Sequence, residues 1–216
     1  IDAGSMFELH PEFGRSVVAV LARVEGQAVG VVANQPKFRG GVLDADAIVK
    51  ATRLINMRTK FGLPLIFLQD LPGVMIGIEA ERTLVAPKLV EMFAVIARSP
   101  VPKVTVVLRK AFGFGYVAMG GPSMGTDYVV TWPNAEIGFM AADNAVEVLN
   151  HKRLRAVRDA EGAEAAQAMA DELEVAIHSA FAPWKAASLA LIHDVIRPDE
   201  TRQAVINGLF IGAGYR

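Results

Sequence analysis

The sequence has no cysteine, only four histidines and almost no net charge. The absence of cysteine excludes a disulfide framework and any zinc or iron–sulfur centre held by thiolates. The 22 basic and 23 acidic residues leave a formal net charge of -1 without long blocks of one sign. Nucleic-acid-binding and membrane-surface proteins carry basic patches, so we expect neither kind of partner.

Long hydrophobic runs are also missing, although 52% of the residues are hydrophobic. The longest charge-free segment, 111–126, is interrupted by five glycines and one proline, and it falls short of the ~18 apolar residues that favour a membrane span. The first five residues lack an initial methionine and show no basic-then-apolar leader. We therefore expect a soluble, cytoplasmic globular chain whose start resembles the middle of a longer protein.

Hydrophobic periodicity predicts one domain of alternating strands and helices. The expected strands are 17–24, 28–34, 65–69, 104–108, 128–132, 135–139 and 194–196. The expected helices are 44–60 with Asp44 as N-cap, an amphipathic helix around 85–96 bent at Pro87, a short helix at 116–119, a region 142–181 interrupted near Gly162, and 201–209. This alternation predicts an α/β fold with a mainly parallel sheet, whose ligand sites lie in loops beyond the carboxyl ends of the strands.

Two glycine-containing loops follow predicted strands, at 70–77 and at 111–115. The second loop leads into a short helix, and free N–H groups at a helix start can stabilise negative charge that develops on an oxygen atom. Such a site needs no side-chain acid, base or nucleophile. The alternative is that these glycines only permit a strand and a helix to pack closely.

Several other motifs are weaker. The segment 121–125 matches G-x-S-x-G, but a helix precedes it and a strand follows, the reverse of a nucleophile elbow. The segment 113–118 matches the dinucleotide pattern G-x-G-x-x-A, but Arg109 to Phe112 separate it from the strand and its helix breaks early. The histidines lack metal-pair spacing, so we expect no metal, and the basic run 152–158 is typical of a solvated helix face.

At these loops the chain resembles the carboxyltransferase (β) subunits of biotin-dependent acyl-CoA carboxylases of the propionyl-CoA, acetyl-CoA and methylcrotonyl-CoA type. The resemblance spans nearly the whole chain and rests on several segments in family order, which are 13–18, 29–36, 70–73 with Gly77, 104–113, 132–137 and 194–202. It implies a crotonase-like ββα spiral and identifies residues 1–216 as the C-terminal half of such a subunit, without the N-terminal half that holds most of the CoA.

The resemblance also implies the chemistry, which is transfer of a carboxyl group from carboxybiotin to the α-carbon of an acyl-CoA. The implied oxyanion donors are the backbone N–H groups of Phe114 and Gly115. The implied cofactor-binding residues are Gly113, Tyr116, Gly73 and Val74, and the implied substrate-binding residue is Val117. Many relatives have a small residue where this chain has Phe114, and the segment 79–83 departs from the propionyl-CoA pattern, so the acyl group stays open.

The implied partners are the missing N-terminal half, a biotin carboxylase and a biotin carrier protein, and we expect homo-oligomers because apolar residues are abundant. Two alternatives stay open. One is an acyl-CoA decarboxylase subunit of the same family, which runs the transfer in reverse. The other is a noncatalytic assembly module that retains the fold.

Overall fold

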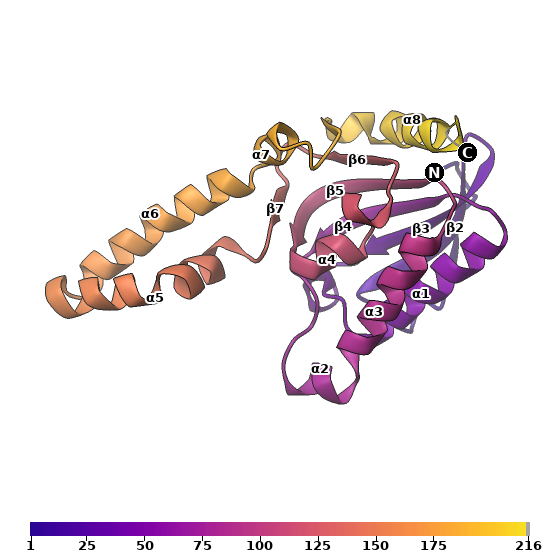
Figure 1. Cartoon of the computed structure of the whole chain (residues 1–216). Coiled ribbons are helices and arrows are strands. Elements are labelled where there is room, and N and C mark those ends of the chain that lie inside the picture. Colours follow the sequence, from indigo (N-terminus) through magenta and orange to yellow (C-terminus); the bar gives the residue numbers. More distant parts are fainter. Residues whose placement is uncertain (215–216) are drawn as a thin grey trace.

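The computed structural model of the chain describes residues 1–214, in which helices cover both faces of a mixed sheet (Figure 1). Its strands are β1 (Phe7–Leu9), β2 (Val17–Val24), β3 (Gln27–Asn34), β4 (Leu65–Leu71), β5 (Lys103–Phe112), β6 (Tyr128–Thr131), β7 (Glu136–Gly138) and β8 (Asp194–Val195). Its α-helices are α1 (Ala45–Lys60), α2 (Ile78–Arg82), α3 (Val85–Arg98), α4 (Gly113–Ala118), α5 (Ala142–Glu161), α6 (Ala163–Phe181), α7 (Pro183–Ser188) and α8 (Thr201–Gly214).

The strand order is β1-β2-β3-β4-β5-β6-β8, and β7 pairs with the end of β5. The first three strands are antiparallel, whereas all pairings from β3 onward are parallel. The β2–β3 connection turns at Glu25 and Gly26, both with positive φ, as the tight turns that match strand twist require. The expected α/β class with a mainly parallel sheet is confirmed.

Each face of the sheet has its own apolar core. One core joins β2, β3 and β4 to α1, α3 and α4. The other joins the five strands β2, β3, β4, β5 and β6 to α8. The expected apolar stripe of α3 is buried through Val85, Leu89, Met92 and Ile96. Pro87 lies in the first turn of this helix, where its missing N–H removes no helical hydrogen bond, so the reason for the expected bend disappears.

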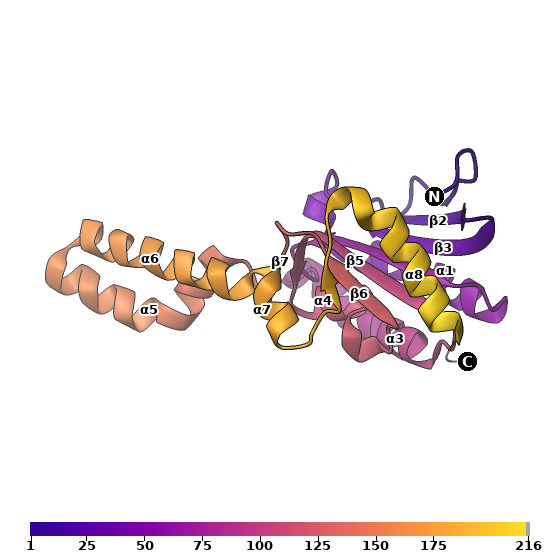
Figure 2. The same ribbon diagram turned by 90° about the horizontal axis from the view of Figure 1, so that it is seen from above.

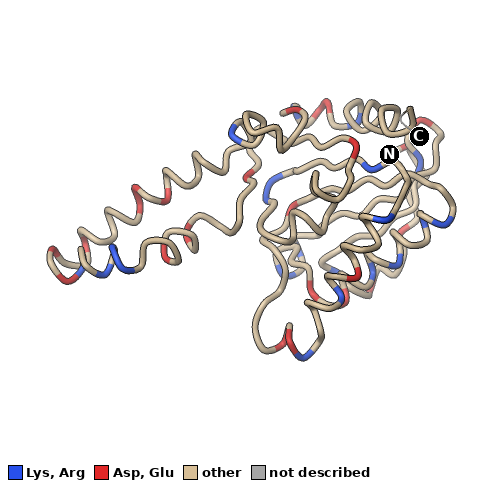
Figure 3. Tube along the Cα trace, in the orientation of Figure 1, with Lys and Arg blue, Asp and Glu red and all other residues tan. Residues whose placement is uncertain are grey.

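Helices α5 and α6 form an antiparallel hairpin that extends away from the sheet, and we call it the arm (Figures 1 and 2). Gly162 joins the two helices with φ 96°, a conformation that glycine adopts readily, so the expected interruption near this residue is confirmed. Acidic and basic residues are interspersed along the arm and the sheet-bearing body (Figure 3). Within residues 1–214, no helix is long and apolar enough to cross a membrane.

Candidate active site at the glycine loops

The two glycine loops meet at the carboxyl ends of β4 and β5. A Cβ atom built on Gly115 would lie 2.6 Å from Leu71 Cδ1 and 3.0 Å from Gly73 Cα. These distances are shorter than normal carbon–carbon contacts, so only glycine at position 115 allows α4 to approach the β4 loop this closely. The close-packing interpretation of the glycines is therefore correct here, and it is compatible with a role for their N–H groups.

Helix α4 begins directly at the end of β5. Phe112 is extended, and Gly113 turns the chain with φ 57°. No side chain caps the helix start, and the first N–H groups of a helix have no partner within it. The N–H groups of Phe114 and Gly115 belong to this set. They form the donor pair that an oxyanion site requires, although their role stays a prediction.

The β4 loop is held by the segment before α1. Gly73 adopts φ 134°, and its carbonyl oxygen accepts a hydrogen bond from the Leu43 N–H over 3.1 Å. Leu43 also forms an isolated parallel bridge with Val74 and accepts a bond from the Met75 N–H over 3.0 Å. The backbone at Gly73 and Val74, both expected to bind cofactor, is thus fixed beside α4 rather than left as a free loop.

The next two expected site residues lie further along α4. Burial raises the pKa of Tyr116 to about 12, so the phenol stays neutral near pH 7 and is no general base there. Its hydroxyl donates to the Leu191 carbonyl oxygen over 3.4 Å, at the long end of hydrogen-bond distances. Val117 is half-buried. The predicted ligand contacts of both residues stay predictions.

The N–H of Phe114 lies in the first turn of α4, whereas its ring lies at the surface. The side chain is 70% exposed, and its ring centroid lies 6.3 Å from that of Phe93 on α3. Its N–H belongs to the backbone at the start of α4, so shortening the side chain would leave that donor in place. The bulk at this position can therefore restrict what approaches the loop without removing its hydrogen-bonding group.

A polar network at this edge of the sheet was not foreseen from the sequence. The Asp70 carboxylate at the end of β4 accepts from the Arg109 guanidinium of β5 over 3.1 to 3.2 Å. The Asp70 N–H donates to Asn34 Oδ1 over 3.3 Å, and Asn34 Nδ2 donates to the Gly41 carbonyl oxygen over 3.1 Å. The network ties the ends of β3, β4 and β5 together. Asp70 and Arg109 are 39 residues apart, so no local sequence pattern predicts that they pair.

The base of the arm lies against the same edge. The Phe181 ring at the end of α6 lies 6.2 Å from the Phe112 ring and 5.5 Å from the Phe139 ring. His178 Nδ1 lies 2.7 Å from Glu136 Oε1 of β7. Since Phe112 immediately precedes Gly113, the arm is attached to the body next to the second glycine loop.

The weaker motifs lead to no site. Ser123 is exposed in a short 3-10 helix between α4 and β6, which is not the context of a nucleophile elbow. Strand β5 reaches Phe112, so the expected gap before Gly113 is wrong. Helix α4 nevertheless has only six residues, shorter than a dinucleotide-binding helix. Residues 1–214 contain no cluster of three metal-ligating side chains, and the basic residues of 152–158 are exposed on the arm.

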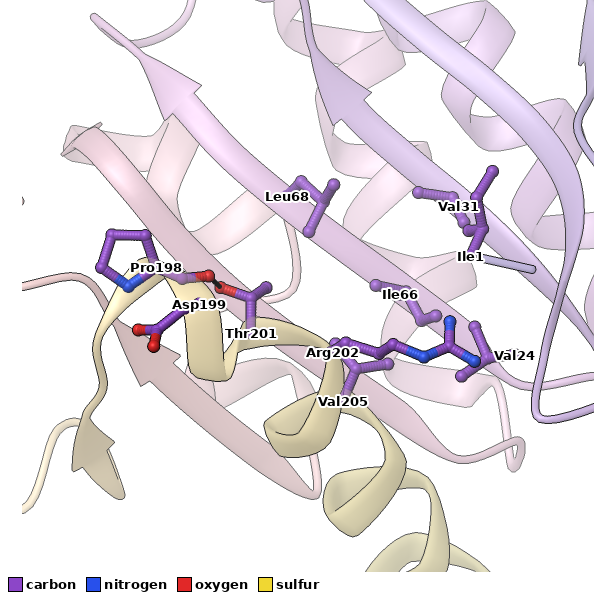
Figure 4. A pocket seen from close by; sticks show the side chains of 10 residues that line it. All are labelled: Ile1, Val24, Val31, Ile66, Leu68, Pro198, Asp199, Thr201, Arg202 and Val205. Atoms are coloured by element: carbon purple, nitrogen blue, oxygen red, sulfur yellow. Dashed lines mark hydrogen bonds between the residues drawn. The ribbon is translucent and has the colours of Figure 1, made fainter. Parts of the chain in front are cut away.

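An apolar hollow lies elsewhere, between α8 and the face of the sheet that this helix covers (Figure 4). It has a volume of about 340 Å³ and is lined by Ile1, Val24, Val31, Ile66, Leu68, Pro198, Asp199, Thr201, Arg202 and Val205. Arg202 pairs with Asp2 over 2.8 Å and with Glu25 over 3.1 Å. None of the site residues expected from the sequence lines this hollow.

Comparison with solved structures defines the fold class. The whole chain superimposes on transcarboxylase 12S, solved as a hexamer with methylmalonyl-CoA and methylmalonic acid bound, with a TM-score of 0.93 and 36% identity. It covers 41% of that chain. This similarity confirms the crotonase-like fold that the sequence resemblance implied.

The same relationship appears in sequence. Residues 1–211 match the carboxyl transferase domain family, and the chain belongs to this family. It is 35% identical to the methylmalonyl-CoA carboxyltransferase 12S subunit of Propionibacterium freudenreichii subsp. shermanii over 97% of this chain and 39% of that protein. It is 32% identical to the methylmalonyl-CoA decarboxylase subunit alpha of Propionigenium modestum over 100% of this chain and 41% of that protein. The chain thus spans about two fifths of the length of these relatives.

Proposed function

We propose that this chain forms the biotin-side part of a carboxyltransferase active site, and that the complete enzyme transfers a carboxyl group from carboxybiotin to the α-carbon of an acyl-CoA. The observation that carries the proposal is the meeting of Gly115 and Gly73 beside the start of α4, which no side chain caps. This arrangement offers backbone donors and no side-chain nucleophile. Carboxyl transfer through stabilised oxyanions requires donors of this kind.

The residues present fit a biotin head group. Contact between α4 and the β4 loop leaves no space for a methyl group on Gly115, so the donors have a fixed direction. When bound, biotin supplies the carboxyl group and a ureido oxygen that gains negative charge as the carboxyl group leaves. The N–H groups of Phe114 and Gly115 would donate to that oxygen, Gly113 would provide the turn that aims them, and Gly73 and Val74 would form the facing wall.

The acyl-CoA site is completed by residues outside this chain. We infer that residues 1–216 belong to a longer subunit, because the relatives are about two and a half times as long, and the family resemblance makes them its C-terminal half. The proposed partners are the N-terminal half, a biotin carboxylase with its carrier protein, and further copies of the subunit, as in the related hexamer. A cytoplasmic location stays a prediction.

The decisive experiment joins this half to its own N-terminal half and supplies free biotin with malonyl-CoA or methylmalonyl-CoA. Biotin-dependent formation of acetyl-CoA or propionyl-CoA is the expected result. Complete inactivity of a correctly folded and assembled protein with both substrates would contradict the proposal and favour the noncatalytic assembly module. The Ser123→Ala variant should retain nearly full activity, since no serine nucleophile is proposed.

One relative supports a second function. The similarity to a methylmalonyl-CoA decarboxylase subunit over the full chain favours a decarboxylase that runs the transfer from acyl-CoA to biotin. The same backbone donors would serve both directions, because each direction develops charge on the same oxygen. The direction is decided by testing carboxylation of propionyl-CoA with the carboxylated native carrier protein in a parallel assay.

A further inference from the structure

Gln69 connects the interior of β4 to α4. Its side chain is fully buried, and its Nε2 donates to the Tyr116 carbonyl oxygen over 3.1 Å and to the Met119 carbonyl oxygen over 2.7 Å. Only the amino group of the amide can donate twice, so the orientation of the side chain is determined. Gln69 therefore holds the end of α4 opposite to the donor pair.

Neither of these two carbonyl groups accepts a hydrogen bond from the described backbone. The Gly115 carbonyl oxygen accepts from Met119, and the Val117 carbonyl oxygen accepts from Gly121, over 3.0 and 3.1 Å. Within the described residues, Tyr116 and Met119 have no such backbone donor for their carbonyl oxygens. A short helix leaves most of its last carbonyls unpaired, and Gln69 provides a partner for two of them.

The amide is retained at an energetic cost. In the described structure, Gln69 Oε1 is buried without a hydrogen-bond partner, which is unfavourable in a protein interior. The preceding strand residues Leu65, Ile66 and Phe67 are apolar and buried. An apolar residue at position 69 would avoid the unpaired oxygen, so the two bonds to α4 are the evident gain from glutamine.

We propose that Gln69 is a positioning residue that fixes the direction of α4, and through it the N–H groups of Phe114 and Gly115. The catalytic consequence rests on the proposed function. A six-residue helix is too short to be stable by itself. It touches the β4 loop at Gly115 and is held at its far end by Gln69, so losing the second attachment allows it to pivot about the first. Donors to a developing oxyanion must stay near 3 Å from it.

A matched control lies on the neighbouring strand. Thr105 of β5 is also fully buried, and its Oγ1 donates to the Gly120 carbonyl oxygen over 2.6 Å. That oxygen also accepts from Thr126 Oγ1 over 2.9 Å, and Gly120 lies beyond α4. Thr105→Val therefore removes a comparable buried bond without releasing the helix.

The test uses the complete protein with its N-terminal half, comparing Gln69→Met with Thr105→Val. Methionine keeps the length of the side chain and lacks the donor. We expect Gln69→Met to accelerate hydrogen exchange at the Met119 amide by about tenfold or more, and to lower kcat for biotin-dependent decarboxylation of methylmalonyl-CoA by about tenfold with KM nearly unchanged. Thr105→Val should stay within about twofold of the original protein in each measurement.

A second variant gives a readout that general destabilisation does not produce. Gln69→Glu can donate one hydrogen bond to α4 only while its carboxyl group is protonated. Its Met119 amide should therefore become better protected, relative to the original protein at the same pH, as the pH is lowered from about 8 to 6, because burial raises a carboxyl pKa. Hydrogen exchange is measured without turnover. If the original protein were inactive, the proposed function would be rejected, but the exchange rates of the variants could still be compared with that of the original protein. Unchanged exchange and kcat in Gln69→Met, or equal effects in Thr105→Val, would overturn the proposal.

Discussion

The glycine-loop edge of the sheet and the arm are held in place in different ways. At the edge, Gly115 and Gly73 touch so closely that a methyl group cannot fit, and the Asn34 side chain bonds β3 to the Asp70 N–H of β4 and to the Gly41 carbonyl oxygen. The arm contacts the body mainly through its base, at Phe181 and His178. The proposed donors therefore depend on a tightly interlocked edge, whereas the position of the arm depends on a few side chains.

The largest effect is expected from breaking the interlocked edge. Gly115→Val places a branched side chain where Leu71 and Gly73 already lie, so α4 must move away from the β4 loop. Transfer activity of the complete protein should fall by about 10²-fold or more, measured with free biotin and methylmalonyl-CoA.

The matched variant at the edge is Phe114→Ala, which keeps the N–H and removes an exposed ring. Its activity should stay within about threefold of the original, because side-chain truncation leaves the donor geometry intact. A severe loss in Phe114→Ala with little loss in Gly115→Val would reverse the assignment of backbone and side-chain roles.

Breaking the base of the arm should mainly affect stability. Phe181→Ala empties the space between Phe112 and Phe139, and Phe-to-Ala changes in buried positions cost about 3–5 kcal/mol. We expect a lower free energy of unfolding in denaturant titrations and faster proteolysis near the arm. Trp184→Ala is the control, because Trp184 is 62% exposed; equal losses in both variants would show that Phe181 is no special attachment.

A smaller effect on stability is expected when the pH changes, because His178 at the base of the arm can gain or lose a proton. Burial works to lower the pKa of His178, but hydrogen bonds and charge from Glu136 and Glu174 outweigh it and raise the pKa above its usual value. A raised folded-state pKa means that the stabilisation is fully present below the unfolded pKa and is lost as pH rises through the folded pKa.

The stability advantage of the original protein over His178→Gln should therefore decrease from about pH 6 to pH 8, and it should stay below about 1 kcal/mol because the ring is partly exposed. Thermal unfolding of both proteins across this range measures the difference. An advantage that grows with pH would contradict the assigned ion pair.

The smallest effect is expected on the outer surface of the arm. Val175 on α6 is 71% exposed, so Val175→Ser should change the free energy of unfolding by less than about 0.5 kcal/mol. Sedimentation of the complete protein checks whether the same surface contributes to association. An unchanged stability with a smaller assembly would identify it as an interface between copies.

Most of the elements, and the segment that holds the proposed donors, could be predicted from the sequence alone. Local patterns identified β2, β3, β4, α1 and the apolar face of α3, because periodicity and turn residues act over short distances. The sequence predicted a short helix at 116–119 after a glycine loop, whereas α4 already begins at Gly113 and ends at Ala118. The family resemblance supplied the expected role of the N–H groups in this segment. The short elements β1, α2 and α7 were missed, since a few residues carry too little pattern.

The contacts between distant residues could not be predicted from local patterns, because they depend on the tertiary structure. Gln69 reaches Tyr116 across 47 positions and Asp70 reaches Arg109 across 39, while Gly115 meets Gly73 because β4 and β5 are parallel neighbours. These contacts depend on strand order, register and the packing of α4, which are properties of the whole sheet. From the sequence, Gln69 is only one polar residue that follows the apolar run 65–68. Its role becomes visible in the fold, where it donates to the carbonyl oxygens of Tyr116 and Met119.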